Sequence, residues 1–238
     1  MFKLSYLDHD TPQDTNGFAD FGTFCHSLLE RWAKGELPAI ALAEEYENGY
    51  DEAVTGPFPP FPRGMPQKYY DEGLAYFENF DGFGDQYEIL TTEEKFVIDI
   101  GGHTFVGIAD LTLCDKQTGG IIVIDHKSKS KNSMKKELDT YRKQLYTYAA
   151  FVKQRFGVFP EKLVFNMFRY GEMIEERFDP VQYQVTLDWI CATIERIENE
   201  LEWAAQPNDF FCRFICSVFN ACPYRDEILA KSNRKKEE

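Results

Sequence analysis

The chain has 238 residues, of which 43% are hydrophobic and 16% aromatic, so it holds enough apolar material for one good-sized core. Its formal net charge of −14 excludes a protein that coats nucleic acid through its overall charge. No apolar run approaches the roughly 18–20 residues needed to cross a bilayer, and the first ten residues lack the apolar stretch of a signal peptide, so we expect a cytoplasmic protein without membrane partners.

The N-terminal part of the sequence has helical periodicity. Apolar residues recur at helical spacing over Gly17–Lys34, and Gly35 provides a stop signal. A second helix is predicted over Ala39–Glu52. The proline-rich segment Gly56–Pro66 is predicted to be a loop, and Gln67–Asn79 again favours a helix.

From Tyr87 onward the pattern changes to short strands separated by glycines. The predicted strands are Tyr87–Leu90, Glu94–Ile100, Thr104–Leu113, Gly120–Asp125, Lys162–Tyr170 and Met173–Phe178. Helices are predicted over Ser133–Phe156 and Val181–Ala205. The continuous apolar run Ile121–Ile124 is typical of a strand buried on both faces. This order predicts a single α/β domain over residues 1–238, with helices packed on a mixed central sheet.

Two carboxylates follow apolar strand residues. Asp110 ends the stretch Gly107–Asp110, and Asp125 ends the buried run. If these strands pair as a hairpin, Asp110 and Asp125 become neighbours. Asp125 and Lys127 are two residues apart, so their side chains leave the same face of an extended chain.

Adjacent carboxylates repel each other unless a cation lies between them, and oxygen ligands of this kind suit Mg²⁺ or Mn²⁺. Lys127 could then hold an attacking water or stabilise charge on a phosphate. The alternative is that Asp110 is a turn residue and that Asp125 and Lys127 form an ion pair at a strand end.

Asp110 followed by Asp125-His126-Lys127 resembles the D…(D/E)-x-K signature of the PD-(D/E)XK nuclease superfamily, and most resembles its RecB-like branch, which includes CRISPR-associated and phage exonucleases. That branch has a histidine in a G-x-x-x-H context on an N-terminal helix, which His26 matches, and Q-x-x-x-Y on a later helix. Alone, His26 would be read as a core histidine. The resemblance implies a restriction-endonuclease-like core.

The resemblance also implies roles for single residues. The metal ligands that it implies are His26, Asp110, Asp125 and the backbone carbonyl of His126. The catalytic set that it implies is Asp110, Asp125 and Lys127, with Gln144 and Tyr148 supporting the site or the DNA strand. We expect the His126 side chain to point away from the metal, and Glu94 to be a solvated charge at a strand start.

A run of lysines follows the catalytic motif, and its members are Lys129, Lys131, Lys135 and Lys136. In an acidic protein this run is predicted to bind DNA phosphates, although a solvated charge run is the alternative. Nearby tyrosines could stack on unpaired bases, which favours single-stranded DNA or DNA ends as the partner.

Three cysteines, Cys212, Cys216 and Cys222, resemble the C-terminal cluster with which RecB-like relatives hold a [4Fe–4S] cluster. In those relatives the fourth cysteine precedes the histidine helix, and this sequence has none before Cys25. Three alternatives stay open: the natural chain begins earlier, another residue such as Cys25 or Cys191 is the fourth ligand, or the thiols are simply reduced and packed.

These patterns predict a Mg²⁺- or Mn²⁺-dependent DNA nuclease, acting as an exonuclease on single-stranded DNA or DNA ends in a bacterium or a phage-infected cell. The alternative from another class is a non-catalytic DNA-end-binding subunit with a nuclease fold. An RNase, or a nuclease that needs an unidentified protein partner, is the third reading.

Overall fold

The computed structural model describes residues 3–8 and 11–230. The first ten residues, where we expected no signal peptide, and the end of the predicted domain at residue 238 therefore lie partly outside the described residues. No helix within the described ranges is long and apolar enough to span a membrane.

Five strands form one mixed sheet, in the order β1-β2-β3-β4-β5. They are β1 (Tyr87–Ile100), β2 (His103–Asp115), β3 (Ile121–His126), β4 (Lys162–Met167) and β5 (Glu172–Arg177). Neighbouring strands are antiparallel except β3 and β4, which are parallel. The connection between this parallel pair is helix α4 (Lys131–Phe156), as a parallel crossover requires.

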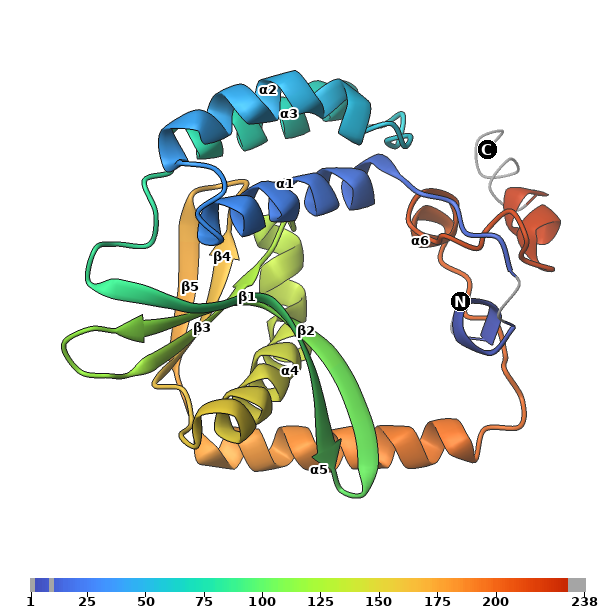
Figure 1. The fold of residues 1–238 in the computed structure, drawn as a ribbon. Coiled ribbons are helices and arrows are strands. Elements are labelled where there is room, and N and C mark those ends of the chain that lie inside the picture. Colours follow the sequence, from blue (N-terminus) through green and yellow to red (C-terminus); the bar gives the residue numbers. More distant parts are fainter. Residues whose placement is uncertain (1–2, 9–10, 231–238) are drawn as a thin grey trace.

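Helices cover both faces of the sheet (Figure 1). On one face lie α1 (Gly17–Ala33), α2 (Leu42–Ala53), preceded by the 3-10 turn η2 (Ala39–Ala41), and α3 (Met65–Glu78). On the other face lie α4 and α5 (Pro180–Glu198). The short helix α6 (Asp209–Phe214) and the π-helical turn η1 (Lys3–Leu7) lie to one side of these layers. This arrangement confirms the predicted α/β fold class, a mixed sheet flanked by helices.

Strand β3 lies at the centre of the hydrophobic core. All six of its residues are buried, as the continuous apolar run predicts. Ile121 and Val123 belong to the core between the sheet and α4, whereas Ile122 and Ile124 belong to the core on the opposite face. The strand therefore delivers Asp125 at its end into a site that is already shielded from water.

Side-chain caps fix the starts of the two helices nearest this end of the sheet. Asn16 accepts hydrogen bonds from the backbone N–H groups of Phe18 and Ala19 at the start of α1. Ser130 accepts one from the N–H of Ser133 at the start of α4. Such caps satisfy helical N–H groups that have no partner within the helix.

Several element ends differ from the sequence prediction, among them β4, which ends at Met167 rather than at Tyr170, and two differences are larger. The two strands expected between Tyr87 and Ile100 are one strand with a register shift between Ile89 and Thr91. Helix α5 ends at Glu198 rather than at Ala205, because Asn199 caps its last turn and its side chain donates to the Glu195 carbonyl.

The segment before α1 lies against the cysteine-rich segment after α6. The Asp14 N–H donates to the Ser217 carbonyl at 2.6 Å, and the Asn220 side chain donates to the Asp14 carboxylate at 2.9 Å. The two segments lie side by side in Figure 1, although about two hundred residues separate them in sequence.

Candidate active site

The two aspartates of the sequence motif lie side by side. Strands β2 and β3 form the predicted antiparallel hairpin, in which Leu111 pairs with Ile124, so Asp110 and Asp125 occupy the next position along. Both are buried, with exposed fractions of 7% and 0%. The backbone N–H of His126 donates to Asp110 Oδ2 at 2.8 Å, which fixes this carboxylate.

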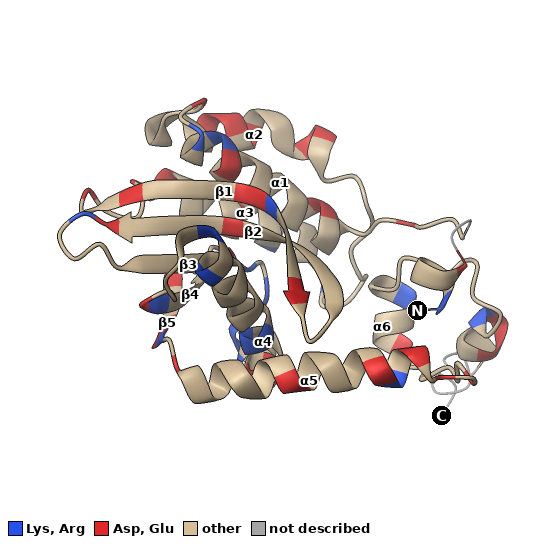
Figure 2. Cartoon of the chain, turned by 60° about the horizontal axis from the view of Figure 1, so that its bottom comes forward, with Lys and Arg blue, Asp and Glu red and all other residues tan. Residues whose placement is uncertain are grey.

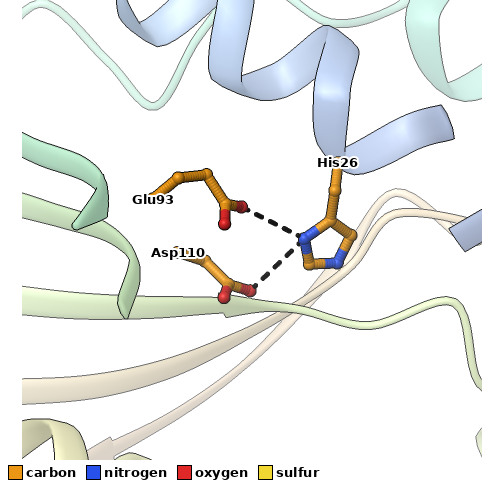
Figure 3. Close-up of side chains that lie close together, drawn as sticks. All are labelled: His26, Glu93 and Asp110. Carbon is orange, nitrogen blue, oxygen red and sulfur yellow. Dashed lines mark hydrogen bonds and ion pairs between the residues drawn. The ribbon is translucent and has the colours of Figure 1, made fainter. Parts of the chain in front are cut away.

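Helix α1 places His26 over these acids (Figure 3). Its Nε2 lies 3.0 Å from the carbonyl oxygen of His126. Its Nδ1 lies 3.7 Å from Asp110 Oδ2 and 3.4 Å from Glu93 Oε1. Three of the groups expected to bind metal are therefore neighbours: the His26 imidazole, the Asp110 carboxylate and the His126 carbonyl.

Glu93 is a site residue that the sequence reasoning missed. It lies on β1 between Thr92, which pairs with Leu111, and Glu94, which pairs with Ala109, so it is opposite Asp110. Its φ of 45° is left-handed, which is uncommon for a residue other than glycine and is found most often at functional sites. The adjacent Glu94, which we expected to be a solvated charge at a strand start, forms an ion pair with Arg155 at 3.3 Å. The sequence signal that could have indicated Glu93 is the pair of adjacent glutamates, Glu93 and Glu94, in the strand that precedes the Asp110 strand.

Asp125 belongs to a polar chain that extends into α4. Its Oδ2 lies 2.6 Å from the Lys127 ammonium, so both side chains leave the same face, as predicted. Lys127 also donates to Gln144 Oε1 at 2.8 Å, and the Gln144 amide donates to the Tyr148 hydroxyl at 2.7 Å. Gln144 therefore holds the lysine, and the Tyr148 hydroxyl links Gln144 to the Asp125 side chain.

Crowding of acids in a dry site changes their proton affinities. Burial, together with the charge on Asp125, raises the pKa of Asp110 to about 7. Burial also raises the pKa of Asp125, against the lowering effect of Lys127. Burial lowers the pKa of His26, but the hydrogen bond to Glu93 and the charge on Asp110 outweigh it, so the pKa of His26 is raised. A bound cation would remove the repulsion that raises the carboxylate pKa values.

The residues present fit a divalent metal ion. One ligand atom each from His26, Glu93 and Asp110 lies within 4.8 Å of the others. Both Asp125 oxygens are buried and accept no hydrogen bond of normal geometry, although Lys127 is close. A buried carboxylate in that state is stabilised by a cation.

The His126 ring is engaged away from these acids. Its Nδ1 lies 3.0 Å from the Asn166 amide, and its ring stacks on Phe83. Burial lowers the pKa of His126 well below its usual value, so the ring is neutral. Its backbone N–H and carbonyl face Asp110 and His26, and its ring packs edge-on against the His26 ring at a centroid distance of 5.5 Å.

The four lysines of the predicted DNA-binding run are spread over the start of α4 and the loop before it. Lys129 lies 3.5 Å from Glu137, and Lys131 lies 2.6 Å from Glu172 on β5. Lys135 and Lys136 are exposed. The structure thus places the run beside Lys127, but two of its four charges have acidic partners within ion-pair distance.

The cysteines lie in different parts of the molecule. Cys212, Cys216 and Cys222 are half-buried free thiols around α6. Cys25 is fully buried in the core below α1, and the Cys191 thiol contacts the Ile100 carbonyl. Within the described residues, His26, Glu93 and Asp110 form the one group of three or more His, Cys, Asp or Glu side chains that are close enough to share a metal ion.

Comparison with known proteins agrees with this geometry. The family model of the PD-(D/E)XK nuclease superfamily matches residues 1–226. A solved structure described as "Crystal structure of SSO0001" is 19% identical over 93% of this chain and 91% of that chain, with a TM-score of 0.36, which is too low to support an argument. No curated protein sequence matches. The family match spans both ends of the sheet and every residue of the site, and the chain belongs to the PD-(D/E)XK nuclease superfamily.

Proposed function

We propose that the chain is a divalent-metal-dependent deoxyribonuclease of the RecB-like branch that trims single-stranded DNA or DNA ends as an exonuclease. The observation that supports this most is the convergence of His26, Glu93 and Asp110 on one point beside the buried Asp125–Lys127 pair. Family membership implies nuclease chemistry, and the branch, the single-stranded substrate and the preference for DNA ends are our inference.

The ligands we assign to Mg²⁺ or Mn²⁺ are His26, Glu93, Asp110, Asp125 and the backbone carbonyl of His126. When bound, the metal would supply an activated water and positive charge next to the scissile phosphate. Glu93 is the addition to the set expected from the sequence. It brings a further carboxylate oxygen to the side of His26 that faces Asp110.

Lys127 is the catalytic cation of this proposal. Its ammonium has one hydrogen bond to Gln144 and one close contact with Asp125, so its position is fixed on two sides. The remaining N–H can point to an attacking water or to a phosphate oxygen. Gln144 and Tyr148 are positioning residues: Gln144 holds Lys127, and the Tyr148 hydroxyl accepts from Gln144 and interacts with the Asp125 side chain.

The alternative function is a DNA-end-binding subunit that is inactive alone or needs a partner. Loss of an acid or of the lysine would favour it, since the metal and the nucleophile would then lack a ligand. All of these groups are present and in contact here, so hydrolysis is the better supported function.

The proposal is tested with end-labelled single- and double-stranded DNA incubated with Mn²⁺, Mg²⁺ or EDTA. We expect cleavage that requires metal and falls by about two orders of magnitude or more in Asp125→Ala and in Lys127→Ala, because each removes a group that acts in the transition state. A ladder that shortens from one end indicates an exonuclease. Absence of cleavage by the folded wild-type chain in both metals would favour the binding subunit.

The [4Fe–4S] cluster stays a prediction from the sequence. Such a cluster takes four ligands, usually cysteines, and Cys212, Cys216 and Cys222 provide three. Cys25, Cys114 and Cys191 lie in other parts of the fold, so within the described residues no fourth cysteine completes the set. No step of the proposed reaction depends on the cluster.

Anaerobic purification tests the cluster. If it forms, we expect bound iron and a broad absorbance near about 400 nm that disappears in Cys216→Ser, because thiolate-ligated clusters absorb there. A colourless, iron-free preparation that is folded and cleaves DNA would show that the three thiols are ordinary packed cysteines.

A further inference from the structure

A groove of about 610 Å³ opens beside the active-site loop. One wall is the segment Ser128–Ser130, which directly follows Lys127. The opposite walls come from the start of α1, the start of α3 and the loop before it, and from Phe210 and Ile215 in and after α6. Arg169 donates to the Ser128 carbonyl at 3.0 Å, which ties the groove floor to the fold.

The charge of this groove is opposite to that of the chain. Its lining includes Arg63, Lys68, Lys129 and Arg169, and none of its described lining residues is Asp or Glu. The chain as a whole has 40 acidic and 26 basic residues. Three other pockets on the described residues each include at least one acidic side chain. A lining that combines four basic side chains with no acidic one sets this groove apart from those three pockets.

The cations of the groove are only partly neutralised from outside it. Arg169 is buried and donates to Glu72 at 2.8 Å, and Lys68 lies 3.8 Å from the same glutamate. Lys129 lies 3.5 Å from Glu137, in an exposed pair of the kind that contributes little. One glutamate therefore faces two cations at one side of the groove.

Three helices also point their N-terminal ends at the groove. The residues that line it there are Asn16, the cap of α1, Met65, the first residue of α3, and Ser130, the cap of α4. A helix N-terminus has partial positive charge and favours anions. The start of α3 has no side-chain cap.

Aromatic side chains alternate with these cations. Phe18, Tyr69, Tyr170 and Phe210 line the groove, and Phe210 is 49% exposed. Cations that follow a backbone, combined with aromatic rings for stacking, are how proteins bind single strands without sequence preference. A volume of this size admits about one or two unstacked nucleotides.

We infer that this groove binds single-stranded DNA and delivers its scissile phosphate past Lys129 to Lys127. The inference rests on the proposed nuclease function and names the substrate path of that same site. Arg63 and Lys68 are the residues whose contribution is new, since no feature of the sequence motif includes them.

The test measures binding of the full chain to a labelled oligothymidylate of about 20 nucleotides, with Ca²⁺ in place of Mn²⁺, over a range of salt concentrations. In Arg63→Ala/Lys68→Ala we expect affinity to fall about tenfold or more. The slope of log K against log salt should become shallower by about 1.4, because two phosphate contacts are lost.

The matched control is Lys153→Ala/Arg196→Ala, which removes one lysine and one arginine outside the groove and should bind as wild type. The swap Arg63→Lys/Lys68→Arg should also retain binding.

Unchanged affinity and salt slope in the groove variant would overturn the inference. Equal affinity for a duplex of the same length, or tighter binding of the matching RNA, would overturn its assignment to single-stranded DNA.

Hydrolysis of bis(p-nitrophenyl) phosphate with Mn²⁺ separates failure of the groove assignment from failure of the proposed nuclease function, because so small a diester needs no groove. If wild type and groove variant both hydrolyse it but bind DNA alike, only the groove assignment fails. If wild type binds DNA through the groove and hydrolyses neither substrate, only the nuclease function fails.

Discussion

At the scale of single residues, the acids of the site oppose the stability of the fold. Asp110 is buried beside Asp125, and its pKa in the folded chain is about 7, against an ordinary value of 3.8. The folded state therefore binds the Asp110 proton more tightly than the unfolded state does. The tighter binding of this proton stabilises the folded state fully at low pH, and the stabilisation is lost as pH rises from about 4 toward 7.

Removing the Asp110 charge should consequently stabilise the metal-free protein. We expect Asp110→Asn to raise the free energy of unfolding at pH 8 by about 1–3 kcal/mol, since an amide can still accept from the His126 N–H but carries no charge. Thermal melting in EDTA measures this. The difference should shrink at pH 5, and added Mn²⁺ should stabilise wild type but not the variant.

The control for this measurement is Asp139→Asn, which changes an exposed carboxylate on α4. We expect it to shift the melting temperature little at either pH. If Asp110→Asn were equally neutral at pH 8, the repulsion between Asp110 and Asp125 would be too weak to require a metal.

Most of the residue-level site was predictable because its parts occur at fixed spacings. His26, Asp110, Asp125 and Lys127 follow from motif and order, and strand periodicity places the last two on one face. Glu93 could not be found in this way. Its place opposite Asp110 depends on the β1–β2 register and on a left-handed backbone, and neither leaves a periodic signal.

At the scale of elements, the helical layer over the site depends on close packing between α2 and α3. A Cβ added at Gly73 of α3 would lie 2.3 Å from the Tyr46 hydroxyl oxygen, and Tyr46 is fully buried. A Cβ at Gly22 of α1 would meet the Ser128 hydroxyl at 3.4 Å, an ordinary contact. Packing therefore requires glycine at Gly73 but not at Gly22.

Alanine at these two positions should have effects of opposite sign. We expect Gly73→Ala to destabilise the protein by about 1–3 kcal/mol through overpacking. We expect Gly22→Ala to stabilise it by about 0.5–1 kcal/mol, because alanine favours the helix and no backbone obstructs it. Chemical unfolding at equilibrium measures both. A neutral Gly73→Ala would mean that α2 and α3 move apart easily.

Element positions were predictable where the hydrophobic period is long and uninterrupted, as in α1 and α4. They were less so where a local polar contact decides. Helical periodicity alone extends α5 to Ala205, but the Asn199 side chain ends it seven residues earlier. The sequence prediction ended one strand at Leu90 and began the next at Glu94, whereas β1 is one strand whose pairing with β2 continues through Thr91 and Thr92.

At the scale of the whole molecule, acidic residues spread over α2, α5 and β1, while basic residues gather on α4 and near the chain ends (Figure 2). The net charge of −14 repels DNA at long range, whereas the groove beside Lys127 is lined by cations that favour phosphates at short range. Composition predicted the first of these features. The groove joins residues from five separate segments, so it could not be predicted before the fold was known.

This separation of charges has a consequence for the rates of DNA binding. In a basic nucleic-acid-binding protein, salt slows association because it screens attraction. Here salt screens a net repulsion, so we expect the association rate constant for single-stranded DNA to rise or stay constant between low and moderate ionic strength. The dissociation rate constant should rise more steeply, because the phosphate contacts in the groove weaken.

Stopped-flow mixing with labelled oligonucleotide would measure the association and dissociation rate constants separately. An association rate constant that falls steeply with salt would contradict the expected net repulsion. If both expectations hold, the protein binds DNA slowly and dissociates from it quickly. It is then held mainly where a free end already occupies the groove.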